Sequence, residues 1–135
     1  MMKSIRKHLR EERGSQLLEF ILTMPLLLIL ITFVFDQFTI LYNKQRALSA
    51  AYKAGRIAAV QPNQGLAEYH GEERGMEELK QCIALQKATI SISNPTTWAK
   101  GKHFEARAKI SFRLLWSNEP YELRESYHMM IENGE

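Results

Sequence analysis

Residues 20–35 read FILTMPLLLILITFVF, sixteen residues without a charged side chain. Asp36 interrupts this run, and the apolar character resumes in residues 38–42, FTILY. With Leu17 and Leu18 upstream, the stretch exceeds the roughly 20 residues that a helix needs to cross about 30 Å of hydrocarbon. A core helix of this length would need a larger protein around it than 135 residues can supply. The sequence therefore predicts one transmembrane helix.

The segment before this run is basic. Residues 1–14 read MMKSIRKHLREERG and carry five basic and two acidic side chains, whereas the remainder has thirteen of each. The net charge of +3 belongs to this segment, which can contact anionic lipid head groups, and no nucleic-acid partner is predicted. An ordinary secretory signal does not fit, because the apolar region is too long for one.

Glu19 is an ionisable residue near the start of the apolar span. An unpaired charge deep in the bilayer costs about 2.5–3.5 kcal/mol or more, which makes Glu19 a functional-site hypothesis with a partner to be found. A cut between Gly14 and Ser15 would create an α-amino group one helical turn from Glu19, on the same or a neighbouring subunit. The other interpretation is a carboxylate that only reaches the membrane interface.

Residues 13–60 resemble a known protein family. The sequence GSQLLEF at residues 14–20 is similar to the prepilin-peptidase recognition sequence of type IV pilins: glycine before the cut, glutamate at the fifth mature position, then an apolar run. More narrowly, the segment resembles the TadE-like minor pseudopilins of tight-adherence (Flp) pilus systems. The shared features are Arg13-Gly14, Leu18-Glu19-Phe20, Pro25 before a leucine-rich run, Asp36 with Phe38, Leu41-Tyr42, and the small residues from Ala50 to Ala59.

The resemblance implies a protein of the cytoplasmic membrane with its N-terminus in the cytoplasm and its C-terminal domain outside. A prepilin peptidase would cut after Gly14, and Glu19 and Phe20 would serve assembly with other pilin or pseudopilin subunits and pilus assembly membrane proteins. The function implied is assembly or structure of a type IV/Flp pilus, with incorporation in the pilus left open. One alternative is an uncleaved single-pass subunit of a conjugation or secretion apparatus, and another is a small membrane-tethered enzyme or sensor.

The sequence divides into four segments. They are a cleavable basic leader (1–14), a transmembrane helix (15–42), a helix extension (43–62) and an extracytoplasmic α+β domain (63–135). In the extension, small residues recur every four positions at Ala47, Ala51, Gly55 and Ala59. Such a stripe lets another backbone approach closely, either a helix of a partner or the chain's own C-terminal sheet.

The C-terminal half predicts a shorter helix followed by three strands. Residues 66–86 have helix-forming composition, but Gly71 and Gly75 confine the expected helix to the part after Gly75. Apolar residues then alternate with polar ones in three runs, which predicts a three-stranded antiparallel sheet that covers a helix. The runs are 87–93, 103–116 and 121–131, with turns expected at Asn94-Pro95 and at residues 117–120.

Individual side chains of this half carry further expectations. Trp98 is expected at the rim of the domain and Trp116 in its core. The cluster of Glu72, Glu73, Glu77 and Glu78 is expected to form a solvated acidic face of the helix.

The sequence carries few signs of catalytic or metal chemistry. The four histidines do not have metal-ligand spacing with one another or with a cysteine or acid, and there is no glycine-rich phosphate loop and no serine or cysteine nucleophile motif. We therefore expect no enzyme activity, no cofactor and no metal. Cys82, alone in the chain, excludes an internal disulfide and is either a small buried thiol in a helix or half of an intermolecular bridge.

Overall fold

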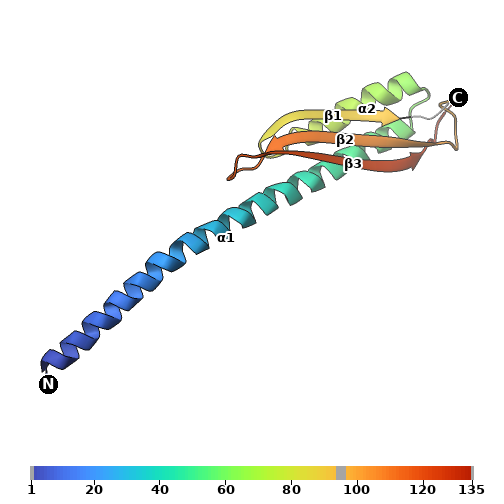
Figure 1. Ribbon diagram of the computed structural model, residues 1–135. Coiled ribbons are helices and arrows are strands. Elements are labelled where there is room, and N and C mark those ends of the chain that lie inside the picture. Colours follow the sequence, from blue (N-terminus) through green and yellow to red (C-terminus); the bar gives the residue numbers. More distant parts are fainter. Residues whose placement is uncertain (1, 94–96, 135) are drawn as a thin grey trace. The chain divides into compact units, whose positions relative to one another are not determined.

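The computed structural model describes residues 2–93 and 97–134 (Figure 1). Its elements are α1 (Met2–Ala59), α2 (Gln64–Leu79), β1 (Leu85–Ser93), β2 (His103–Arg113) and β3 (Pro120–Met130). This order confirms the predicted α+β class. The turn expected at Asn94-Pro95 lies outside the described residues. Contacts divide the chain into two units, Met1–Phe35 and Asp36–Glu135, and each is described by itself.

The first unit consists of the N-terminal part of α1. Its side chains from residue 11 to residue 31 are all exposed, including the leucines and phenylalanines of the apolar run. Among the described residues, one helix is long and apolar enough to cross a membrane, with a mean hydropathy of 2.5 in its most apolar part. An exposed apolar helix of this length is the mark of a single-pass membrane protein.

The second unit is built on an antiparallel sheet with strand order β1-β2-β3. Ile90 faces Ala108 across the first pair of strands, and Ile110 faces Leu123 across the second. Strict alternation along β2 gives one buried face and one wet face, as predicted. The buried face of β2 consists of Phe104, Ala106, Ala108, Ile110 and Phe112.

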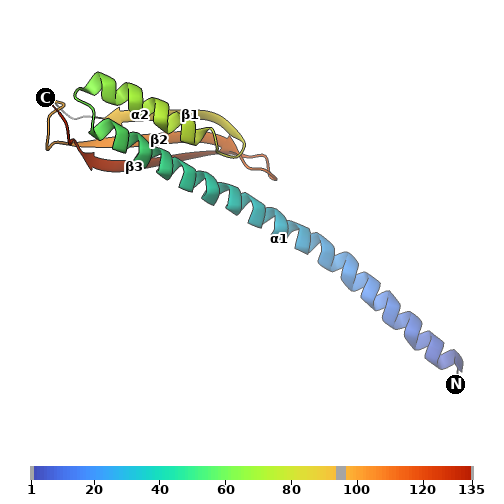
Figure 2. The ribbon, with the colours of Figure 1, turned by 180° about the vertical axis from the view of Figure 1, so that it is seen from behind.

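Two helices cover the buried face of this sheet. Figures 1 and 2, seen from opposite sides, show the sheet on one side and α2 with the C-terminal part of α1 on the other. Small residues allow close packing here: a Cβ on Gly55 would lie 3.0 Å from Met129 Sδ, and one on Gly71 would lie 3.2 Å from the backbone oxygen of Ala54. Close contact of these layers builds the core of the unit.

The expected limits of the second helix were wrong at both ends. The helix begins at Gln64, where the Asn63 side chain accepts a hydrogen bond from the Leu66 amide and caps the first turn. The glycines lie inside it because the sheet leaves no room for a side chain: a Cβ on Gly75 would lie 2.7 Å from Ile90 Cγ1. The helix ends at Leu79, so the buried Cys82 lies in the following turn.

The two tryptophans exchange the environments expected for them. Trp98 is buried against Phe104, and its indole Nε1 donates a hydrogen bond to the Gln61 carbonyl at 2.9 Å. Trp116 lies past the end of β2, in the turn before β3, and is exposed. The period-two pattern continues to residue 116 in the sequence, but the strand stops at Arg113, so Trp116 lies beyond the sheet that was expected to bury it.

Candidate functional site

The junction between the basic segment and the apolar run is helical and open. Residues 14–20 lie in α1 with exposed side chains, and a Cβ built on Gly14 has nothing within 4 Å. Thr23 Oγ1 donates a hydrogen bond to the backbone oxygen of Glu19, whereas no partner of the Glu19 carboxylate occurs among the residues that the structure describes. Gly14, Ser15, Glu19 and Phe20 are thus available to another molecule in this conformation.

Asp36 is another acidic residue on α1 and, unlike Glu19, it is buried. Its Oδ1 accepts a hydrogen bond from the backbone amide of Trp116 at 3.2 Å. This contact ties α1 to the loop between β2 and β3, 80 residues away in the chain.

Asn43 clamps α1 to the turn that precedes β1. Its side-chain Nδ2 donates to the Ile83 carbonyl at 2.9 Å, and its Oδ1 accepts from the Ile83 amide at 2.8 Å. The Asn43 side chain is fully buried, and a buried polar group needs hydrogen-bond partners inside the protein. One residue of the turn, Ile83, satisfies both polar ends of the side chain.

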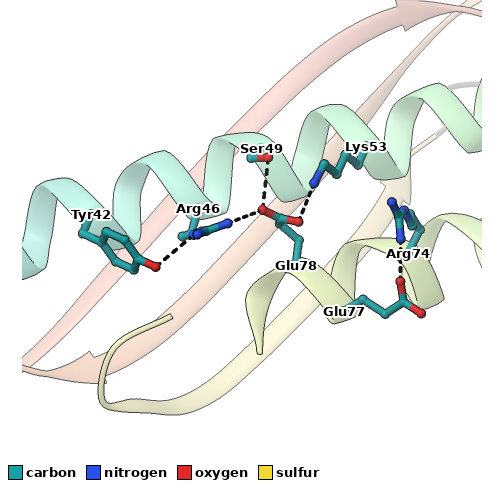
Figure 3. A network of polar contacts seen from close by, with 7 residues as sticks. All are labelled: Tyr42, Arg46, Ser49, Lys53, Arg74, Glu77 and Glu78. Atoms are coloured by element: carbon teal, nitrogen blue, oxygen red, sulfur yellow. Dashed lines mark hydrogen bonds and ion pairs between the residues drawn. The ribbon is translucent and has the colours of Figure 1, made fainter. Parts of the chain in front are cut away.

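Glu78 is the centre of a polar network between α1 and α2 (Figure 3). Its carboxylate accepts hydrogen bonds from Arg46 Nη1 at 2.8 Å and Lys53 Nζ at 2.6 Å, and from Ser49 Oγ at 3.4 Å. The Arg46 guanidinium also donates to the Tyr42 hydroxyl at 3.2 Å. The hydrogen bond from Lys53 and that from Arg46 lower the pKa of Glu78, against the opposing effect of burial.

The expectation of a solvated acidic face is therefore wrong for Glu78. Its neighbour Glu77 shows the contrast, because it pairs with Arg74 on the surface of α2 at 2.7 Å. Glu78 is buried because it lies on the same side of α2 as Gly71 and Gly75, one of which precedes it by three residues.

Sequence reasoning missed Asn43 as well, although a signal was present. The stripe of small residues at 47, 51, 55 and 59 extends backward by the same four-residue step to Asn43 and Thr39, and all six positions are buried. A polar residue on a buried stripe needs a hydrogen-bond partner inside the protein.

The stripe itself lies inside the second unit. Ala47, Ala51, Gly55 and Ala59 are buried, and Gly55 faces Met129 of β3 and Ala106 of β2. In the structure this stripe packs on the chain's own sheet, which is one of the two alternatives; the other was a helix of a partner. Within the described residues, no three His, Cys, Asp or Glu side chains gather where a metal ion could be held.

The sequence was compared with models of known protein families. Residues 14–56 match the model of the TadE-like protein family. This segment is TadE-like. Neither the comparison with curated proteins nor that with solved structures gives a match.

The TadE-like segment begins at Gly14 and ends at Arg56, so it contains the open junction, the apolar run and most of the buried stripe. It also contains Asp36 and Asn43, whose partners Trp116 and Ile83 lie outside it. The TadE-like match associates the chain with a pilus system, as a protein with one membrane-spanning helix.

Proposed function

We propose that this chain is a TadE-like minor pseudopilin that takes part in the assembly or structure of a type IV/Flp pilus. The observation that carries the proposal is the position of the TadE-like match, which begins at Gly14 and includes Glu19 in an exposed apolar helix. A prepilin peptidase removes residues 1–14 and leaves Ser15 as the first residue. The chain acts through assembly with other subunits rather than through catalysis.

The proposed orientation puts the basic segment in the cytoplasm and the C-terminal α+β domain, residues 63–135, outside the cytoplasmic membrane. The junction at Gly14 supports this orientation, because a prepilin peptidase cuts at the cytoplasmic edge of the span and the leader must therefore lie in the cytoplasm. Its partners are this peptidase, other pilin or pseudopilin subunits, assembly membrane proteins and the surrounding lipid.

Glu19 is the residue proposed to drive assembly. A carboxylate in hydrocarbon is unfavourable unless it is paired, and the amine of Ser15 becomes available only after the cut. If the amine comes from a neighbouring subunit, docking neutralises two charges together and favours association.

Leader removal is tested by mass spectrometry of the membrane-extracted protein. We expect a mature form that begins at Ser15, and we expect Gly14→Val to block the cut because the added side chain obstructs an extended backbone in the peptidase. Gln16→Ala, two residues away, is the control and should be cut normally. Intact Met1 on the membrane-resident protein, in cells with an active prepilin peptidase, would instead favour the uncleaved single-pass subunit of a conjugation or secretion apparatus.

The role of Glu19 is tested by following leader removal and recovery of the pilus complex in the same cells. Glu19→Gln keeps the shape of the side chain and removes its charge, so we expect normal cutting and loss of assembly. Glu12→Gln is the matched control, since that charge is discarded with the leader. A cleaved Glu19→Gln protein that assembles at the wild-type level would refute the role of the charge.

A further inference from the structure

The turn between β2 and β3 presents two large apolar side chains. Leu115 is 52% exposed and Trp116 is 61% exposed, although Leu114, the first residue after β2, is buried. Tryptophan and leucine side by side at the tip of a turn are unfavourable in water. Their surroundings in the functional protein therefore need an explanation.

The backbone of this turn is fixed by hydrogen bonds at both sides. The Leu114 amide donates to the Glu119 carbonyl at 2.9 Å, and the Asn118 amide donates to the Leu114 carbonyl at 3.1 Å. Asn118 has a φ of 57°, the left-handed conformation that asparagine tolerates in turns. The tip residues 115–117 are consequently held in one arrangement that keeps Leu115 and Trp116 outward.

The level of this tip along α1 is given by Asp36. The Trp116 amide donates to Asp36 Oδ1 at 3.2 Å, and Asp36 is the first charged residue after the apolar run. Twenty helical residues, 17–36, at about 1.5 Å each span about 30 Å, the thickness of the hydrocarbon layer. A span that begins at Leu17 would place Asp36, and the Trp116 amide bonded to it, at the boundary between hydrocarbon and head groups.

Two more apolar side chains are exposed at the same level. Phe38 and Leu41 on α1 are 56% and 64% exposed. Leu41 lies five residues beyond Asp36, which is about 7.5 Å along the helix, and the head-group layer on each side of a bilayer is about 5–8 Å thick. On this placement of the span, the four exposed side chains would lie within the depth of one head-group layer.

We propose that Phe38, Leu41, Leu115 and Trp116 form an interfacial anchor that inserts into the head-group layer of the bilayer that α1 spans. Lipid is the occupant because Phe38 and Leu41 follow the apolar run on the same helix, separated from it by Asp36 and Gln37, and because tryptophan prefers the membrane–water interface, where its ring is apolar and its N–H is wet. The anchor gives the second unit a second attachment to the membrane besides its covalent link. The proposal holds for either orientation of the span and does not depend on leader removal.

Tryptophan fluorescence of the full chain tests this anchor. The chain is reconstituted at low protein-to-lipid ratio in phosphatidylcholine vesicles, either plain or with brominated acyl chains that quench indole on contact. Trp98 serves as the internal control, because its Nε1 is bonded to Gln61, beyond the end of α1. Ala59 lies 23 residues past Asp36, about 35 Å further along the helix.

The contribution of Trp116 is the difference between the wild-type chain and Trp116→Phe, so the buried Trp98 need not be changed. We expect Trp116 to emit at shorter wavelength in vesicles than a water-exposed indole, to lose intensity with brominated lipid, and to resist quenching by aqueous iodide. The emission that remains in Trp116→Phe should be insensitive to the brominated lipid.

Two results would overturn the anchor. Quenching of Trp116 by iodide and not by brominated lipid would place the turn in water. Protection of Trp116 from both quenchers would mean that protein covers the turn, as in an interface between subunits.

Discussion

Replacing Glu78 with glutamine tests the ionic contact between α1 and α2. The carboxylate is only 8% exposed and accepts hydrogen bonds from Arg46 and Lys53. A hydrogen bond to a charged group contributes about 1.5–3 kcal/mol. The two cations are 32% and 38% exposed, so water screens both contacts and solvates the cations when the carboxylate is gone. We therefore expect Glu78→Gln to lower the free energy of unfolding by about 2 kcal/mol, less than two fully buried bonds would give.

The same substitution has a pH signature. The pKa of Glu78 is lowered in the folded protein, chiefly by the hydrogen bond from Lys53, so the ionised form stabilises the fold above the ordinary carboxyl pKa of about 4.3. This contribution is lost as the pH falls through the lowered pKa, because the protonated carboxyl then resembles glutamine. The stability difference between wild type and variant should be constant from about pH 7 to pH 5 and should close at lower pH.

Thermal melts of the full chain in detergent, followed by near-ultraviolet circular dichroism, measure this difference. For a domain of about 100 residues, 1 kcal/mol corresponds to about 4–8 °C, so the melting temperature should fall by roughly 8–16 °C at pH 7. Glu77→Gln is the matched control, since Glu77 pairs with Arg74 on the surface, and its effect should be small. Equal melting temperatures for Glu78→Gln and Glu77→Gln would refute the assignment of the network to stability.

Three further predictions concern the second unit. Phe112→Ala should destabilise it by about 3–5 kcal/mol in denaturant titrations because the ring is fully buried, whereas Arg107→Ala on the outer face should change little; equal effects would contradict the register. Asn43→Ala should lower the free energy of unfolding by about 1–3 kcal/mol and speed hydrogen exchange of the Ile83 amide, which donates to Asn43. An unchanged exchange rate of this amide would contradict the clamp. Burial raises the pKa of the Cys82 thiol to about 11, so alkylation at pH 8 should be slow until the domain unfolds, and rapid labelling of the folded chain would argue against this burial.

The order of elements was predictable because it depends on local patterns. A sixteen-residue uncharged run needs lipid whatever follows it, and the alternation from Phe104 to Phe112 needs one buried face. The four-residue spacing of Ala47, Ala51 and Gly55 likewise shows that one side of a helix is closely approached. The TadE-like segment was recognisable from Gly14 onward for the same reason, since its features follow one another along a single helix.

The limits of α2 were mispredicted because glycine has two opposite meanings in a helix. Its low propensity weakens an isolated helix, which argues against a helix before Gly75. In the folded protein Ile90 and Ile92 of β1 lie against Gly75 and Gly71, so that only glycine fits there. Tertiary packing therefore outweighs propensity, and no local pattern carries that information.

The sequence by itself predicted the membrane helix, the three strands and the buried face of β2, because all of these follow from the type and spacing of neighbouring residues. Only the tertiary structure decided which polar residues are satisfied inside the protein and which apolar ones stay outside. Glu78 meets Arg46 across 32 residues of chain, Asn43 meets Ile83 across 40, and Asp36 holds the Trp116 turn across 80. Such pairs form where folding brings distant segments together, so neither partner's sequence neighbourhood contains a sign of the other.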